Sequence, residues 1–183
     1  KGLSVIPVDK DTTTARPLVP VYVADVANSD FQDLIRDVLD SGRVLYLHLS
    51  APTKTMRRLA ENRADQETKK PKSRVYRDAD HPEGRPAKTT PDDRFGLSEV
   101  ERALCEEENT VARVYMEILR QCRAQNILVT VEAPANSWFW EQPAVVAELR
   151  GERADGLVSA VCHNCMRGGV TSDTVRWVGT VPG

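Results

Sequence analysis

One stretch of sequence decides the fold that we predict: Val44-Leu45-Tyr46-Leu47-His48-Leu49-Ser50-Ala51-Pro52-Thr53-Lys54-Thr55. Its first six residues are mostly apolar, and a Ser-Ala-Pro turn and a polar loop follow. This pattern is typical of a buried central strand that ends in a loop at one edge of a sheet. Ligands of open α/β sheets bind outside the carboxyl ends of the strands. We therefore expect the functional site beside Pro52 and Thr53.

The segment before this stretch predicts a helix. Ser29 and Gln32 have the spacing of a capping box, and Gly42 is a natural residue for the end of a helix. Between them, one apolar stripe is formed by Phe31, Leu34, Ile35, Val38 and Leu39. Two short apolar runs, 3–8 and 18–24, come earlier and read as strands that end at Asp9 and Asp25. A strand, a helix and a strand joined by tight connections predict a parallel βαβ unit.

The second half of the chain alternates in the same way. Ser98 and Glu101 form a capping box for a long helix that reaches Cys122, with Glu106-Glu107-Glu108 on its solvent side. A buried strand over 127–131 then ends in Glu132-Ala133-Pro134. A helix over 143–149 and strands over 157–161 and 175–181 follow, the last two separated by a turn at Gly168-Gly169. The whole predicts a doubly wound α/β domain with a mostly parallel sheet.

Bulk properties agree with one α/β domain. The chain has 183 residues, enough for a single core, and its net charge of −2 gives no overall nucleic-acid signature. No apolar run approaches the roughly 20 residues of a membrane span, and the four cysteines do not form a disulfide framework. These features predict no membrane partner and an intracellular location, nuclear or cytoplasmic. They leave the oligomeric state open.

A long polar segment, about 54–96, interrupts the pattern. It contains the basic run Lys69-Lys70-Pro71-Lys72-Ser73-Arg74 and the turn-forming His81-Pro82-Glu83-Gly84. A loop of this length in a compact domain is functional or disordered. The basic run could contact phosphates, but many acidic residues lie nearby, so a solvated loop through Arg77 is the preferred interpretation.

The motifs together resemble the cytosine-5 DNA methyltransferases. These enzymes have a Pro-Cys pair after one sheet strand and Glu-Asn-Val or Glu-Asn-Pro after the next, where this chain has Pro52-Thr53 and Glu132-Ala133-Pro134. The chain is most similar to divergent domains of this kind in retroelement polyproteins of dinoflagellates and other eukaryotes. Further matching segments are Ser41-Gly42-Arg43-Val44, His81-Pro82-Glu83-Gly84, Asn109 with Tyr115, Ser137 with Trp140, and Cys165-Met166 with Gly168-Gly169.

The resemblance implies a Rossmann-like class I methyltransferase fold that uses S-adenosylmethionine on a nucleic acid. Asp9 would then hold the cofactor ribose and Asp25 the adenine amine. Pro52 and Thr53 would occupy the nucleophile turn, and Glu132 with Pro134 would hold a flipped-out base. The family's first strand and its glycine-rich turn would lie upstream of Lys1, so we expect a sheet that lacks its first strand.

The departures from the family pattern fall on the reactive positions. Thr53 stands where the family has its cysteine, Ala133 replaces the asparagine, and Asp173 replaces a lysine near the end. Attack on the ring needs a soft nucleophile, and a threonine hydroxyl without a base does not supply one. We therefore predict a methyltransferase-like domain with impaired catalysis. An active methyltransferase of another specificity, and a non-catalytic module for nucleic-acid binding or polyprotein assembly, are the alternatives.

Several other residues have two interpretations. Trp138 and Trp140 could stack on a base, but packing is the preferred interpretation. His48 is interpreted as a buried histidine with satisfied hydrogen bonds rather than a catalyst. Cys162-His163-Asn164-Cys165 resembles half of a zinc site, but no second pair has the required spacing, so we predict no metal.

Overall fold

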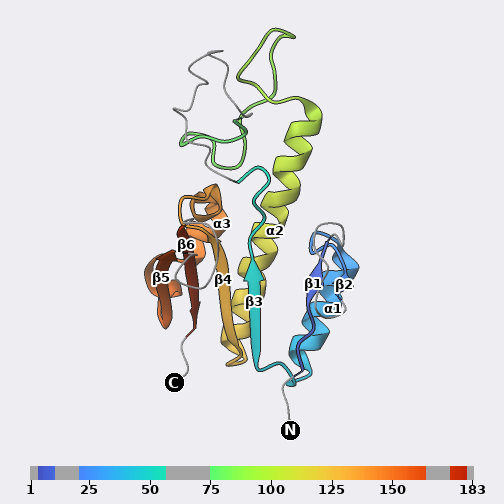
Figure 1. The fold of residues 1–183 in the computed structure, drawn as a ribbon, viewed down its shortest axis with the longest axis vertical. Coiled ribbons are helices and arrows are strands. Elements are labelled where there is room, and N and C mark those ends of the chain that lie inside the picture. The colour runs from blue at the N-terminus through green and yellow to red at the C-terminus, as the bar shows by residue number, and fades with distance from the viewer. Residues whose placement is uncertain (1–3, 11–20, 57–74, 164–173, 181–183) are drawn as a thin grey trace. The chain divides into compact units, whose positions relative to one another are not determined.

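The computed structural model describes residues 4–10, 21–56, 75–163 and 174–180. They belong to two compact units, residues 1–44 and residues 45–183. Together they form a mixed α/β protein, which confirms the predicted class (Figure 1). The doubly wound, Rossmann-like arrangement stays a prediction. None of the described helices is both long enough and apolar enough to cross a membrane.

The first unit contains two short strands and one helix. Strand β1 (Val8–Asp9) pairs in parallel with β2 (Tyr22–Val23). Strand β1 is shorter than the predicted run and lies at its end, and residues 18–20 of the second predicted run lie outside the described residues. The side chains of Tyr22 and Phe31 stack with their ring centroids 6.2 Å apart, which joins the strand pair to the helix.

Helix α1 (Ser29–Asp40) has a different cap from the predicted one. The Asn28 side chain accepts hydrogen bonds from the amides of Asp30 and Phe31, so Asn28 is the N-cap and the Ser29–Gln32 capping box is wrong. Gln32 instead donates to the Val26 carbonyl at 3.0 Å. Asparagine is as good an N-cap as serine, which explains why the helix begins one residue early. Gly42 follows the helix with φ +67°, in agreement with its predicted role.

The second unit is built on a four-stranded sheet. Its strands are β3 (Tyr46–Ser50), β4 (Leu128–Pro134), β5 (Leu157–His163) and β6 (Thr174–Thr180), in the order β3-β4-β6-β5. Strands β3 and β4 are parallel, and β6 is antiparallel to both β4 and β5. One of the three pairings is thus parallel, because the last strand returns between β4 and β5 instead of continuing the parallel series.

Strand β3 differs from the buried central strand that its apolar sequence predicts. In the four-stranded sheet it pairs with β4 alone, and only Leu49 among its five residues is buried. Leu45 and Tyr46 are more than half exposed, at 66% and 51%. The apolar run is therefore a poor guide to burial here, because period-2 alternation puts half of its side chains on the open face.

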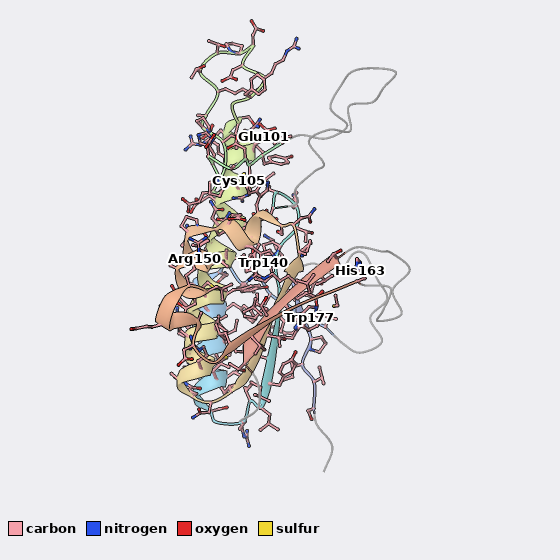
Figure 2. The ribbon with its side chains drawn as sticks, turned by 90° about the vertical axis from the view of Figure 1, so that its left-hand side faces the viewer. Glu101, Cys105, Trp140, Arg150, His163 and Trp177 are labelled. Atoms are coloured by element: carbon pink, nitrogen blue, oxygen red, sulfur yellow. The ribbon has the colours of Figure 1, made fainter. Side chains whose placement is uncertain are left out.

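One face of this sheet is covered by helix α2 (Glu99–Ala124), which runs along β3 and β4 (Figures 1 and 2). The predicted Ser98–Glu101 capping box is present. The helix buries Ala112, Tyr115, Met116, Leu119 and Cys122, and β4 buries Val129, Val131 and Ala133. Val100, in the first turn of the helix, is 71% exposed.

Short elements complete the core after β4. They are the 3₁₀ turn η1 (Trp138–Glu141), helix α3 (Pro143–Glu148) and the 3₁₀ turn η2 (Gly151–Ala154). The buried Glu148 carboxylate joins α3 to α2, because Arg120 Nε lies 3.0 Å and Arg123 Nη1 3.6 Å from its oxygens. Trp138, Phe139 and Trp140 are all buried, which confirms that the two tryptophans pack in the core.

The loop before α2 contains a turn organised by Asp93. Its carboxylate accepts hydrogen bonds from the amides of Phe95 and Gly96, both at 2.9 Å, and from Thr89. These backbone bonds lower the pKa of Asp93 to about 2. A lowered folded-state pKa means that the carboxylate stabilises this turn at pH values above its ordinary value of 3.8, and that this contribution is lost as the pH falls toward about 2.

We expect the amide NMR signals of Phe95 and Gly96 to shift together with a midpoint near the lowered Asp93 pKa. Asp93→Asn, which keeps an acceptor oxygen but cannot titrate, should abolish this step. A midpoint at the ordinary aspartate value would contradict the described turn.

Candidate functional site

The two motifs of the predicted site meet at one edge of the sheet. In the parallel β3–β4 pair, Ser50 lies opposite Glu132, and the Ala51 amide donates to the Glu132 carbonyl at 2.8 Å. The Pro52-Thr53 turn therefore begins directly beside Glu132, as the sequence predicts for the ends of neighbouring parallel strands. Glu132 and Pro134 lie inside strand β4, however, and not in the loop after it. The last strand extends the pairing, because Glu132 lies opposite Trp177 of β6.

The loop that carries Thr53 is also bound to the segment after β4. The Met56 carbonyl accepts hydrogen bonds from the Trp138 amide at 2.7 Å and from the Ser137 hydroxyl at 3.1 Å. Ser137 is at the same time the N-cap of η1. The loop after β3 and the turn after β4 are thus held as one structure, although about 80 residues separate them in the sequence.

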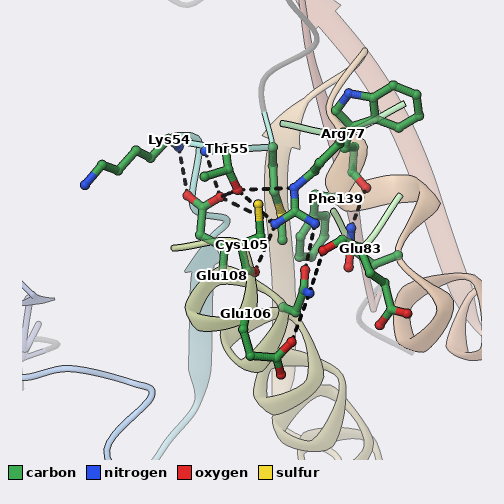
Figure 3. Close-up of polar contacts among 12 residues, drawn as sticks. Lys54, Thr55, Arg77, Glu83, Cys105, Glu106, Glu108 and Phe139 are labelled. Atoms are coloured by element: carbon green, nitrogen blue, oxygen red, sulfur yellow. Dashed lines mark hydrogen bonds and ion pairs between the residues drawn. The ribbon is translucent and has the colours of Figure 1, made fainter. Parts of the chain in front are cut away.

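The same loop is attached to helix α2 by Glu108. The carboxylate of this residue accepts hydrogen bonds from the amides of Lys54 and Thr55, both at 2.8 Å, and from the Thr55 hydroxyl (Figure 3). Glu108 and Thr55 are both buried. The sequence prediction that placed Glu108 on the solvent side of the helix is therefore wrong. Its neighbours Glu106 and Glu107 are exposed, as predicted.

Arg77 occupies the centre of this cluster. Its guanidinium donates to Thr55 Oγ1 at 2.8 Å, to the Cys105 carbonyl at 3.0 Å and to Asn109 Oδ1 at 2.7 Å (Figure 3). Nη2 also lies 3.9 Å from Glu108, and the Arg77 side chain is fully buried. The solvated loop expected through Arg77 is therefore wrong at this residue. An arginine can be buried here because carbonyl, hydroxyl, amide and carboxylate oxygens surround its five N–H groups.

Burial changes the acid–base properties of two groups in this cluster. It lowers the pKa of Arg77, and the nearby Cys105 and Glu108 oppose this effect only in part. It raises the pKa of the Cys105 thiol, which the positive charge of Arg77 offsets only in part. Cys105 is therefore a poor nucleophile, and the same holds for Cys122, whose pKa burial raises to about 11.

The His81-Pro82-Glu83-Gly84 motif packs on the same cluster. The Pro82 carbonyl accepts hydrogen bonds from Arg77 Nη1 at 2.7 Å and from Gln142 Nε2 at 2.5 Å, and the Glu83 carbonyl accepts one from Asn109 at 2.9 Å. Gly84 has φ +130°, and a Cβ there would lie 3.2 Å from the Cβ of Cys105. A glycine is needed at this position both by the backbone and by the close approach to α2.

A second polar cluster lies on the face of the sheet opposite α2. His48 Nδ1 lies 2.8 Å from Thr130 Oγ1, which is itself 2.6 Å from the Tyr46 hydroxyl. The other ring nitrogen, Nε2, lies 3.5 Å from Glu132 Oε2. The His48 ring stacks on Trp177 with centroids 5.1 Å apart. The His48 side chain is 35% exposed, so the prediction that it is buried is wrong.

Thr53 itself is exposed. Within the described part of the chain, no basic side chain forms a hydrogen bond to its hydroxyl. A threonine hydroxyl in this situation is a weak nucleophile, since it needs a neighbouring base to remove its proton. Thr53 therefore lies exposed at the edge of the sheet, and no described basic side chain activates its hydroxyl.

The two predicted cofactor residues lie in the first unit. Asp9 ends β1 and is exposed, and Asp25 follows β2. Asp25 accepts the Ala27 amide at 2.9 Å and pairs with Lys10 Nζ at 2.8 Å. Partial burial raises the pKa of Asp25, but the hydrogen bonds from Lys10 and Ala27 outweigh this and the pKa lies below its ordinary value. Asp25 is therefore an engaged carboxylate.

The sequence did not predict a role in the site for the side chains of Thr55, Arg77, Glu108, Thr130 and Trp177. Asn109 was named as part of a family motif, without its hydrogen bonds. The Cys165-Met166 and Gly168-Gly169 motif lies outside the described residues. Among the described residues, no group of three or more metal-ligating side chains is close enough to hold a metal. Comparisons with protein-family models, characterised proteins and solved structures found no match to this chain.

Proposed function

We propose that this chain is a methyltransferase-like nucleic-acid-binding domain of retroelement origin, related to the cytosine-5 enzymes and impaired in catalysis. The observation that carries the proposal is the convergence of four separate motifs. Pro52-Thr53, His81–Gly84, Asn109 and the segment Glu132–Trp140 are joined through Arg77, Glu108 and the Met56 carbonyl. Two of these motifs lie at the carboxyl ends of the neighbouring strands β3 and β4, and ligands of open α/β sheets bind outside such strand ends.

The topology supports the same proposal. A class I methyltransferase sheet ends with an antiparallel last strand that is inserted beside its neighbour, and the order β3-β4-β6-β5 has this feature. The parallel β1–β2 pair with α1 corresponds to the strands expected before β3. The resemblance expects one further strand, upstream of Lys1.

The chemistry explains why we expect binding without efficient transfer. S-adenosylmethionine would supply the methyl group, and Asp9 would hold its ribose hydroxyls as an acid at a strand end does in nucleotide-binding folds. Glu132 would bind the Watson–Crick edge of an unstacked base at the sheet edge. Carbon–carbon bond formation on the ring needs a covalent nucleophile, and among the described residues no basic side chain is bonded to the Thr53 hydroxyl to activate it. This favours the non-catalytic alternative, a module that binds nucleic acid on the same fold.

Two assays test the proposal. Fluorescence anisotropy with labelled single-stranded oligonucleotides should show binding that weakens as salt is raised, and tritiated S-adenosylmethionine should transfer no methyl group to the same strands. Methyl transfer by the natural chain would overturn the claim of impaired catalysis. The absence of binding to DNA and to RNA strands would overturn the proposed function itself.

The substitution Thr53→Cys is expected not to restore methyl transfer. The thiol would be a better nucleophile, but Ala133 and Asp173 also replace residues of the family pattern. Thr53→Ser is the matched control, since it keeps a hydroxyl of similar chemistry. If Thr53→Cys transfers labelled methyl groups above the level of Thr53→Ser, the nucleophile is the only missing component and the degeneration is confined to one residue.

A further inference from the structure

Strand β5 forms one edge of the four-stranded sheet and lacks the features that usually protect such an edge. Among the described strands it pairs with β6 alone, in one unbroken register over all 7 of its residues (Figure 1). Proteins protect an exposed edge with charged residues, with proline, with a bulge or with a very short strand. The segment Leu157–His163 contains no lysine, arginine, aspartate, glutamate or proline. As far as the structure describes its surroundings, the β5 edge is therefore open to pairing with a further strand.

The ladder on the other side of β6 shows which backbone groups of β5 lie at this edge. The Ala135 amide donates to the Thr174 carbonyl at 2.9 Å, at the end of the antiparallel β4–β6 ladder. Backbone groups of successive residues in a strand point to opposite sides, so the even-numbered residues of β6 face β4 and the odd-numbered ones face β5. In the β5–β6 register, odd-numbered residues of β6 lie opposite even-numbered residues of β5. The even-numbered residues of β5 are thus bonded to β6, and Leu157, Ser159 and Val161 direct their N–H and C=O groups outward.

The side chains of β5 also favour a further strand. Val158 is 48% exposed and Val161 is 60% exposed. Successive side chains of a strand alternate between faces, so these two valines lie on opposite faces of the sheet. A strand paired with β5 would cover apolar surface on both faces, and the burial of this surface would stabilise the pairing.

We infer that β5 pairs with the β5 strand of a second copy of this chain, antiparallel and with Ala160 on the twofold axis. In this register, which pairs every residue of β5, Ser159 lies opposite Val161 of the other copy. Both residues present outward-facing backbone groups, so these groups bond to one another. Like charges directly opposite one another would disfavour self-pairing, and this strand has none. A twofold interface closes at two copies, so the product is a dimer with one continuous sheet. This inference does not depend on the proposed function.

The mass of the natural chain in solution is the first test. Sedimentation equilibrium from the micromolar to the millimolar range should show a monomer that becomes a dimer as the concentration rises, because one strand pair makes a small interface. A monomer throughout this range would overturn the inference, whatever other partner the edge accepts. Assembly beyond the dimer would overturn it as well, because twofold pairing uses the β5 edge of both copies.

The substitution Ala160→Lys should abolish the dimer. The new side chain would meet its own copy across the axis, and two ammonium groups directly opposite one another repel. Ala103→Lys is the matched control, since Ala103 is also exposed but lies on α2. Far-UV circular dichroism of both variants should match that of the natural chain. A dimer that persists in Ala160→Lys, or that is lost equally in both variants, would contradict pairing through β5.

The substitution Ala160→Cys tests the register without adding charge. Because the backbone groups of residue 160 face β6, this residue would form a non-hydrogen-bonded pair with its own copy, with Cα atoms about 4.5 Å apart. A disulfide spans this separation. Under mild oxidation, Ala160→Cys should therefore form a covalent dimer faster than the control Ala103→Cys, as measured by non-reducing gel electrophoresis. Equal rates for the two variants would overturn the inference, even if Ala160→Lys fails to fold.

Discussion

Replacing Arg77 by methionine is expected to lower the free energy of unfolding by about 3–5 kcal/mol, the range for breaking a buried ion pair. Methionine fills much of the same volume but donates no hydrogen bond. The carbonyl oxygens of Pro82 and Cys105 would lose buried donors, and the charge of Glu108 would lose its nearby cation. Urea denaturation followed by circular dichroism measures the change.

Arg113→Met is the matched control for this prediction. Arg113 pairs with Glu106 on the same helix, but both side chains are exposed, at 45% and 62%. An exposed pair contributes about 1 kcal/mol or less. Two variants with equal stability would show that the buried cluster does not hold the loop. The double variant Arg77→Met with Glu108→Gln should lose less than the sum of the two single changes, because the carboxylate then no longer lacks its partner.

Replacing Phe139 by alanine is expected to lower the free energy of unfolding by about 3–5 kcal/mol. Phe139 is fully buried in η1 and packs edge-on against Trp140, with ring centroids 5.0 Å apart. The substitution removes apolar area and leaves a cavity beneath the turn that holds Met56. The midpoint of urea denaturation should fall without a large change in slope.

Phe95→Ala is the control, because it makes the same chemical change at a side chain that is 74% exposed. Its only described ring contact is with the Arg85 guanidinium, 5.9 Å from the ring centroid. We expect a loss of about 0.5 kcal/mol, as for ordinary surface substitutions. If Phe139→Ala costs no more than Phe95→Ala, the aromatic segment after β4 is not part of the core.

The fold elements were predictable where a local signal and the tertiary contacts agree. Ser98 and Glu101 specify the start of α2, because each side chain forms a hydrogen bond with the backbone amide of the other. These two residues are only three positions apart, so the start of the helix can be predicted from local sequence. Glu132 beside Ser50 was predictable too, since the ends of neighbouring parallel strands lie at one edge. Asn28 replaced Ser29 as a cap because two good capping residues are adjacent, and local sequence does not decide between them.

The residues that hold the site together were not predictable, because their roles depend on partners far away in the sequence. Glu108 belongs to a run of three glutamates. It is a buried acceptor because the backbone amides of Lys54 and Thr55, more than 50 residues away in the sequence, donate hydrogen bonds to its carboxylate. Arg77 lies at the end of a basic stretch. The local sequence around it does not differ from that of a solvent-exposed loop, so it does not predict that this arginine is buried. His48 lies in an apolar run that predicts burial, but β3 pairs with β4 alone in its sheet and the His48 side chain stays 35% exposed.

The anchoring of Met56 and Tyr76 has a practical consequence. The Met56 carbonyl accepts hydrogen bonds from Ser137 and Trp138, and the Tyr76 carbonyl accepts one from the Arg85 amide. The partners in these hydrogen bonds all lie outside residues 57–74, so the bonds do not depend on how many residues separate Met56 from Tyr76. A fluorescent protein or an affinity tag inserted between Met56 and Tyr76 should therefore leave the Thr53 turn in position.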